Sequence, residues 1–238
     1  SDGEAFAVDP PRFVEAYEGG LRGARVVGVA DTHAHADYIS GAEALARAHD
    51  VPYYLHPLDA IYPYDGTPGA LRFKPVVGGE RLRVGRAEIL VVHTPGHTEG
   101  SVTYRCGDAF ALTGDFIFVG SVGRPDLGGK TDEWTKVLFE SLRAAKRAWP
   151  AELRIYPAHY GSAAERAADR TVGGAFGELE NEPLRIDDAE RFAAWIRSRA
   201  GKFPEAYRRI KAINIGLESV EDEEADVLEA GRNECALK

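Results

Sequence analysis

The sequence has no methionine and only two cysteines, Cys106 and Cys235. The cysteines lie far apart and outside any C-x-x-C pair, so neither a disulfide framework nor a zinc knuckle is supported. We expect both to be reduced thiols with no special role. The chain also begins at Ser1, a few residues before an apparent strand at 5–8. This start and the missing methionines indicate either that an N-terminal piece precedes Ser1 or that modified methionines are missing from the sequence as written.

Long apolar runs and basic stripes are also absent. No run approaches the roughly 20 apolar residues that a membrane-spanning helix needs, and no signal peptide opens the chain, so we expect a cytoplasmic protein without a membrane partner. The formal net charge of −9 disfavours nucleic acid as a partner. An acidic run at 218–229 is expected to be an exposed, partly disordered strip or a dimer fringe. A homodimer is the default expectation for the assembly.

The 238 residues, 44% hydrophobic and 28% charged, are enough to bury one large core. Strand and helix patterns alternate along the chain, which is typical of an α/β protein. Strands are predicted at 4–8, 24–30 and 51–56, hairpins at 81–96 and 102–115, and a further strand that ends at His159. Helices are predicted at 10–21, 44–49, 134–145, 187–201 and 204–216. Ser40 and Glu43 have the spacing of a capping box that would open the second helix.

Polar residues gather where four of these predicted strands end. Because strand ends of a layered α/β protein converge on one edge, we expect these side chains to share a small volume. The residues are His33, His35, Asp37, His97, Asp115 and His159. The other histidines are expected to play structural roles: His49 and His56 at the surface or in hydrogen bonds, and His93 in a structural hydrogen bond.

Four motifs in these positions resemble those of metallo-β-lactamase-fold proteins. They are HAHADY at 33–38, TPGHTEGS at 94–101, LTGD at 112–115 and YPAHYG at 156–161. The resemblance implies an αββα four-layer sandwich with a metal at one edge of the two sheets. It also implies a core at 1–165, preceded in most such folds by one or two further strands. Residues 166–238 would form a helical C-terminal extension packed on that core.

Tyr38 departs from the pattern of the hydrolases in this family. In those hydrolases, residues matching His33, His35 and His97 hold a first metal. Residues matching Asp37, the next histidine, Asp115 and His159 hold a second. Here that next histidine is Tyr38. A phenol has a pKa near 10 and is a poor substitute for neutral imidazole as a zinc ligand, so the second metal is expected to be weak or absent.

The set His33, His97 and Asp115 still offers two imidazoles and one carboxylate. This is the facial triad of non-haem iron(II) oxygenases, which leaves coordination positions open for substrate and dioxygen. The three residues also match the iron ligands of persulfide dioxygenases, a branch of this fold that the GRPDL loop at 123–127 and the segment 202–217 resemble too. The resemblance implies one Fe(II) per chain, with zinc or manganese as further possibilities. It also implies oxidation of a glutathione-type persulfide by O2 to sulfite and thiol.

The remaining site residues would then support these three ligands. His35, Asp37 and His159 would fix the imidazole tautomers and the carboxylate angle. Tyr38 would be either another hydrogen-bond donor or a packing residue. Arg124 would either orient Asp115 or attract a substrate carboxylate, unless it forms a salt bridge with Asp126. Tyr160 is expected to line the mouth of the site.

The predicted C-terminal helices are expected to contribute packing and, at most, charge. Phe192, Trp195 and Ile196 form an apolar stripe that is ordinarily core. The last helix carries four residues that would either reach a glutathione carboxylate or, for most of them, form a solvated basic face. They are Tyr207, Arg208, Arg209 and Lys211.

Two other functions remain open at this point. A thioester hydrolase of the glyoxalase II type would use a dinuclear centre and a metal-bound hydroxide. Tyr38 disfavours this function, whereas Asp37 and His159 favour it. A catalytically silent metal-binding module is the second alternative. Nothing in the sequence favours a β-lactam substrate.

Overall fold

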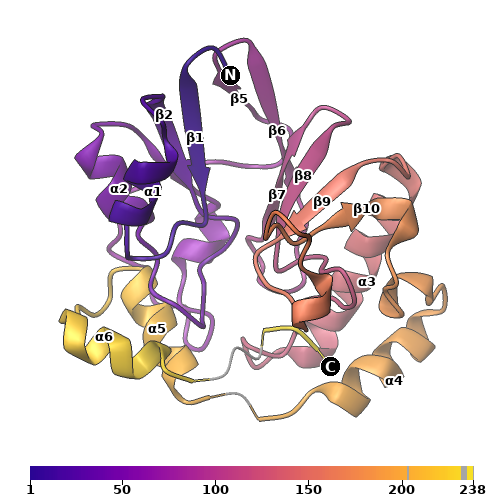
Figure 1. The fold of residues 1–238 in the computed structure, drawn as a ribbon. Helices are drawn as coiled ribbons and strands as arrows, with labels where there is room; N and C mark the ends of the chain where they lie inside the picture. Colours follow the sequence, from indigo (N-terminus) through magenta and orange to yellow (C-terminus); the bar gives the residue numbers. More distant parts are fainter. Residues whose placement is uncertain (203, 232–234, 238) are drawn as a thin grey trace.

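The computed structural model describes residues 1–202, 204–231 and 235–237, which form two sheets packed face to face (Figure 1). The first sheet is parallel, in the order β1 (Glu4–Val8), β2 (Arg25–Ala30), β3 (Tyr53–Leu55) and β4 (Lys74–Pro75). Helices α1 (Glu15–Gly20) and α2 (Ala42–Ala48) lie on its outer side. Leu45 and Ala46 of α2 pack there against Val26 and Val29 of β2.

The second sheet has the order β10-β9-β8-β7-β6-β5. Its antiparallel part comprises β5 (Arg81–Val84), β6 (Ala87–His93), β7 (Val102–Cys106) and β8 (Phe110–Gly114). Strand β9 (Arg154–Pro157) runs parallel to β8, and β10 (Gly174–Ala175) pairs antiparallel with β9. Helices α3 (Thr131–Ala148) and α4 (Ala189–Arg199) cover the outer face. The two predicted hairpins are therefore confirmed.

Apolar side chains from both sheets form the core between them. Phe6 and Ala30 of the first sheet share one cluster with Val91, Val102 and Tyr104 of the second. A separate cluster joins α3 and α4 to the outer side of the second sheet and includes the predicted stripe of Phe192, Trp195 and Ile196. The helix-sheet-sheet-helix order confirms the predicted αββα sandwich.

Residues beyond 165 add to this frame in two ways. Strand β10 and helix α4 extend the second half, whereas α5 (Ala206–Asn214) and α6 (Asp222–Glu229) lie below the first half in Figure 1. Short 3-10 helices occupy Pro57–Ala60, Ala163–Glu165, Phe176–Glu178 and Pro183–Arg185. The division of the chain at residue 165 stays a prediction. Within the described ranges, none of the helices combines the length and the apolar character needed to cross a bilayer.

The acidic run differs from its prediction, because most of it forms helix α6 rather than a partly disordered strip. Arg12 pairs with Asp222, Asp226 and Glu229 of this helix. These ion pairs attach α6 to the segment that follows β1. Glu229 Oε1 also accepts a hydrogen bond of 2.7 Å from Ile39 N, in the loop that follows β2.

The predicted capping box at the start of α2 is wrong. The helix begins after Gly41, which forms no side-chain cap. Ser40 Oγ instead donates a hydrogen bond of 2.7 Å to Asp31 Oδ2 and accepts one of 3.0 Å from Ala42 N. The hydroxyl is thereby turned toward the strand end, so it cannot cap the third residue of the helix as well.

Helix α3 supports the turn that carries His97, and this contact gives a stability prediction. Gly96 has a φ of +136°, and a Cβ there would overlap with the backbone of Leu138. Leu138 is fully buried. We expect Leu138→Ala to lower the free energy of unfolding by about 2–5 kcal/mol, because it leaves a cavity beneath this turn. Urea denaturation measures the loss. Val137→Ala, on the 37% exposed neighbour, should change it by less than about 1 kcal/mol; equal losses would contradict the expectation.

Candidate metal centre

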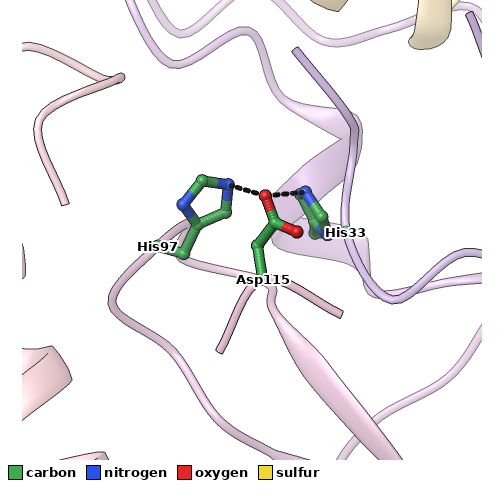
Figure 2. A group of neighbouring side chains, drawn as sticks. All are labelled: His33, His97 and Asp115. Carbon is green, nitrogen blue, oxygen red and sulfur yellow. Dashed lines mark ion pairs between the residues drawn. The ribbon is translucent and has the colours of Figure 1, made fainter. Parts of the chain in front are cut away.

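Three of the predicted site residues converge at the edge of the two sheets (Figure 2). His33 follows β2, His97 follows β6 and Asp115 follows β8. Asp115 Oδ2 lies 3.4 Å from His97 Nε2 and 3.8 Å from His33 Nε2. All three residues are buried, and the two imidazole rings stand nearly perpendicular, at 88°.

The chemistry of these three atoms fits a bound metal ion. Among the described residues, none forms a hydrogen bond with His33 Nε2, His97 Nε2 or Asp115 Oδ2, although all three atoms are buried. Buried polar atoms normally have hydrogen-bond partners. Three buried acceptor atoms that point toward one another without such a partner are therefore typical of a cation-binding site. Burial lowers the pKa of His33 well below its usual value and also lowers that of His97. Both rings are therefore neutral near pH 7, as metal ligands must be.

The remote nitrogen of each imidazole is held by a hydrogen bond that fixes the tautomer. His97 Nδ1 donates to the carbonyl oxygen of Arg124 at 2.9 Å. His33 Nδ1 lies 2.9 Å from Thr32 Oγ1, which itself donates to Asp9 Oδ2 at 2.8 Å. His33 Nδ1 must therefore donate, which leaves the Nε2 lone pair of both rings directed at the cluster.

Close packing also fixes the segment that supports His97. A Cβ at Gly123 would overlap with the carbonyl oxygen of Asp115 and lie 2.9 Å from His97 Nδ1. Only glycine therefore lets this segment approach both ligands closely. The approach explains why the GRPDL motif begins with a glycine.

His159 connects the two aspartates of the predicted second site. Its Nδ1 lies 2.6 Å from Asp115 Oδ1, and its Nε2 lies 2.8 Å from Asp37 Oδ2. Burial would lower the pKa of His159, but the charges of Asp115 and Asp37 and the hydrogen bonds to them raise it well above its usual value. The same contacts hold the pKa of Asp115 far below its usual range, although burial acts in the opposite direction. An imidazolium thus bridges the two carboxylates.

His35 and Tyr38 belong to a second group of polar residues. His35 Nε2 lies 3.2 Å from Asp9 Oδ1, 3.8 Å from Asp31 Oδ1 and 2.9 Å from the Tyr38 hydroxyl. Burial would lower the pKa of His35, but the carboxylates of Asp9, Asp31 and Asp37 raise it to about 9. The Tyr38 ring also stacks obliquely on the His35 ring, with centroids 4.3 Å apart. Tyr38 therefore both forms a hydrogen bond and packs.

Sequence reasoning missed Asp9 and Asp31, which form this second group with His35. The signal was present, because Asp9 directly follows β1 and Asp31 directly follows β2. It also missed Asn214 of α5. Asn214 Nδ2 donates to the carbonyl oxygens of His35 at 2.9 Å and of Tyr38 at 2.8 Å, which holds the loop after β2 in place.

The predicted substrate residues lie at the border of the cluster. The Arg124 guanidinium donates to both Asp126 oxygens, each at 2.7 Å, which is the salt bridge considered as its alternative. Its contact with His97 is made through its main chain. Tyr160 is 48% exposed and lies beneath Arg166. The substrate roles of Arg124 and Tyr160 stay predictions.

Cys235 was expected to have no special role, yet the structure places it against the site. The thiol is fully buried among Ala36, Leu127 and Tyr207, and the Cys235 carbonyl oxygen accepts a hydrogen bond of 3.0 Å from Arg124 N. Burial raises its pKa well above the usual value, and the charges of Asp37 and Asp115 add to this effect. It is therefore a protonated thiol near neutral pH.

A cavity of about 680 Å³ opens beside the second-site residues. Asp37, Tyr38 and His159 form its polar wall, and Val8, Leu112, Pro157, Val227 and Leu228 are among its apolar lining. The cavity is large enough for a small organic molecule, and it adjoins Asp37 and His159 rather than His33, His97 and Asp115, which do not line it.

A profile of the metallo-beta-lactamase superfamily matches residues 6–170. The chain belongs to this superfamily. An uncharacterised protein of Aquifex aeolicus is 33% identical over 171 residues, which cover 66% of this chain and 79% of that protein.

Two relatives with named activities match shorter parts of their own length. The mitochondrial persulfide dioxygenase ETHE1 of Homo sapiens is 30% identical over 162 residues, 66% of this chain and 59% of that protein. The hydroxyacylglutathione hydrolase of Halorhodospira halophila is 34% identical over 123 residues, 50% of this chain and 44% of that protein.

Solved structures show the same fold. A metallo-beta-lactamase from Staphylococcus aureus matches with a TM-score of 0.78 and 28% identity, over 93% of this chain and 68% of that chain. ETHE1 from Myxococcus xanthus matches with a TM-score of 0.75, over 91% of this chain and 90% of that chain; its 21% identity supports the fold alone. A protein crystallised in a di-iron-bound form matches with a TM-score of 0.55 and 30% identity, over 71% of this chain and 83% of that chain.

The geometry predicts that His97 is needed to hold the metal. We expect His97→Ala to remove most of the bound metal, because it deletes one of three convergent donors and opens the buried cluster to water. Elemental analysis of the purified protein measures this loss. His93→Ala is the matched control, since His93 Nε2 bonds to the Glu99 carbonyl oxygen at 2.9 Å and lies outside both groups of candidate ligands. Full metal retention in His97→Ala would contradict the assignment.

Proposed function

We propose that this protein is a mononuclear non-haem iron persulfide dioxygenase that oxidises a glutathione-type persulfide with O2. The observation that carries the proposal is that the two carboxylate oxygens of Asp115 have different partners. Its Oδ2 faces two neutral imidazoles, whereas its Oδ1 is engaged by His159. Two histidines and one carboxylate on one side of an ion are the ligand set of non-haem iron(II) oxygenases. The human relative with this activity supports the choice of substrate.

The tyrosine at position 38 supports a single metal. In the superfamily hydrolases that use two metals, a histidine at this place is a ligand of the second. Here the Tyr38 hydroxyl lies against His35 Nε2 at 2.9 Å and donates to the Asp9 carbonyl oxygen at 3.3 Å. Burial raises the pKa of Tyr38 well above its usual value, so the phenol stays protonated and is a poor ligand. Both nitrogens of His159 already contact carboxylates.

The overall reaction is balanced as R–S–SH + O2 + H2O → R–SH + SO3²⁻ + 2 H⁺. The terminal sulfur loses its bond to the inner sulfur and is oxidised, while four electrons pass to O2. Bound iron(II) would supply adjacent coordination positions for the terminal sulfur and O2 and the electrons that begin O2 reduction.

The residues of the chain hold this arrangement. Thr32 and the Arg124 carbonyl oxygen orient His33 and His97. His159 holds Asp115 at one oxygen, so the other oxygen stays directed at the cluster. Burial of all three ligands keeps bulk water from the reacting sulfur, which limits side reactions.

A thioester hydrolase of the glyoxalase II type is the second candidate. Asp37 and His159 are both present at the site, and the relative from Halorhodospira halophila carries that activity in its name. The di-iron-bound structure also shows that a related chain holds two metals. A hydrolase would need a second ion to displace His159 from its two carboxylates.

Metal content and product analysis distinguish these functions. For protein purified without oxygen, we expect one iron per chain, O2 uptake with glutathione persulfide, and one sulfite formed per O2 consumed. Elemental analysis, an oxygen electrode and a sulfite assay measure these quantities. The control substrate is a hydroxyacyl thioester of glutathione. Two metals with thioester cleavage would establish the hydrolase, and absence of both activities in iron-loaded protein would indicate a catalytically silent metal-binding module.

Position 38 provides a separate test of metal stoichiometry. We expect Tyr38→His to raise the metal content from one ion per chain toward two, because imidazole restores a donor beside Asp37. Tyr38→Phe is the matched control: it removes the hydroxyl without adding a ligand, and its metal content should stay at one. A second ion in the wild type, or none gained in Tyr38→His, would refute the role given to this tyrosine. Elemental analysis at saturating metal measures both variants.

A further inference from the structure

Lys211 on α5 is buried, which differs from the solvated basic face expected for most charged residues of this helix. Its side chain is 2% exposed, on the same helix face as Tyr207 and Asn214. Arg209, two residues earlier, is instead partly exposed and pairs with Glu218 and Glu224. Over the described ranges, no carboxylate lies within ion-pair distance of the Lys211 ammonium group.

The carboxylate with the largest effect on Lys211 is already satisfied by other donors. Asp59 Oδ1 accepts from Gly100 N at 2.8 Å, and Asp59 Oδ2 accepts from Ala34 N and Thr98 Oγ1, each at 2.8 Å. Burial lowers the pKa of Lys211, while the charges of Asp59, Asp115 and Asp37 act in the opposite direction. A buried ammonium without a direct partner destabilises a fold, so packing alone does not explain this residue.

Lys211 lines a cavity of about 350 Å³ on the His97 side of the metal centre. Thr98 and Glu99, which directly follow His97, form one wall. The aromatic walls are Tyr62, Tyr64 and Trp134. The wall formed by Thr98 adjoins His97 in the chain, so the cavity that Lys211 lines lies beside the metal centre.

The other charged residues of this cavity have partners of their own. Lys130 pairs with Glu99 at 3.1 Å, and Glu99 also accepts from Trp134 Nε1 at 3.3 Å. Asp65 accepts from Thr67 N at 2.9 Å. Of the two lysines that line this cavity, Lys211 is therefore the one without an ion-pair partner among the described residues. The Arg208 guanidinium of the same helix stacks on the Tyr64 ring, 4.5 Å from its centroid.

We propose that Lys211 is the anion-binding residue of this cavity and holds an oxyanionic group beside the metal centre. The identity of the anion rests on the proposed function: it is either the sulfite product or a carboxylate of the thiol carrier. Both share the chemistry that an ammonium recognises, which is a charge-assisted hydrogen bond to an anionic oxygen. The aromatic walls would contact the apolar part of the carrier.

Binding measurements on zinc-loaded protein test this role without turnover, because zinc does not undergo redox chemistry. Calorimetric titrations with sulfite and with S-methylglutathione distinguish the two sources of the anion. We expect Lys211→Met to weaken binding of at least one of them by about tenfold or more. Arg209→Met removes the same charge from the same helix and should leave both affinities within about twofold. Lys211→Arg should retain most of the binding.

The melting temperature of Lys211→Met is a second measurement. If Lys211 only stabilised the fold, this variant would melt at a lower temperature than the wild type. Because methionine fills a similar volume without a charge, Lys211→Met should melt at the same temperature as the wild type or higher. Unchanged affinity for both ligands in this variant, or a lower melting temperature, would overturn the proposal. These assays need neither persulfide nor O2, so a failure of the dioxygenase proposal would leave their outcome unaffected.

Discussion

The two oxygens of Asp115 face different partners, and the metal centre depends on this separation. His159 holds Oδ1, and the imidazoles of His33 and His97 stand near Oδ2. The separation follows from the second sheet. Asp115 and His159 follow the parallel neighbours β8 and β9, in which Gly114 pairs with Pro157 after a register shift. Parallel pairing brings both strand ends to the same edge, which places His159 within 2.6 Å of Asp115 Oδ1 and leaves Oδ2 directed at the two imidazoles.

The centre also requires that the two halves of the sandwich dock. His33 comes from the first sheet, whereas His97 and Asp115 come from the second. Two hydrogen bonds join the halves beside the ligands: Val102 N donates to the Thr32 carbonyl oxygen at 2.8 Å, and the Tyr104 hydroxyl donates to that of Asp31 at 3.1 Å. A metal ion bound by both halves would add to this docking, because a site that exists only in the folded state couples binding to folding.

The sequence was sufficient to predict residues that stand at strand ends. It was insufficient to predict contacts that depend on how loops and helices pack. Strand ends predicted the six polar residues of the site, and the same rule applied to β1 and β2 would have found Asp9 and Asp31. The partner of Arg124 could not be decided, because Asp126 and Asp115 were both plausible and only the loop conformation selects Asp126.

Helix α5 shows why the burial of Lys211 could not be predicted from the sequence. Tyr207, Ile210, Lys211 and Asn214 have the i, i+3, i+4, i+7 spacing of a single helix face, and all four are buried. The pattern was therefore visible, but a lysine on it usually indicates a boundary with solvent. Only the position of the helix against the loop after β2, held there by Asn214, shows that this face is covered.

Charge balance gives an independent reason to expect a divalent cation. Asp37 and Asp115 share His159, and Asp9 and Asp31 share His35, so each pair of carboxylates is neutralised by one imidazolium only. Burial raises the pKa of Asp31 to about 6, although His35 opposes this, so Asp31 is still mostly ionised at pH 7. The buried Lys211 ammonium and the buried Asp59 carboxylate offset each other, so two negative charges are left in a buried region, where unpaired charge is strongly unfavourable. A divalent ion between His33, His97 and Asp115 would neutralise both, which links the ligand geometry to the stability of the whole edge.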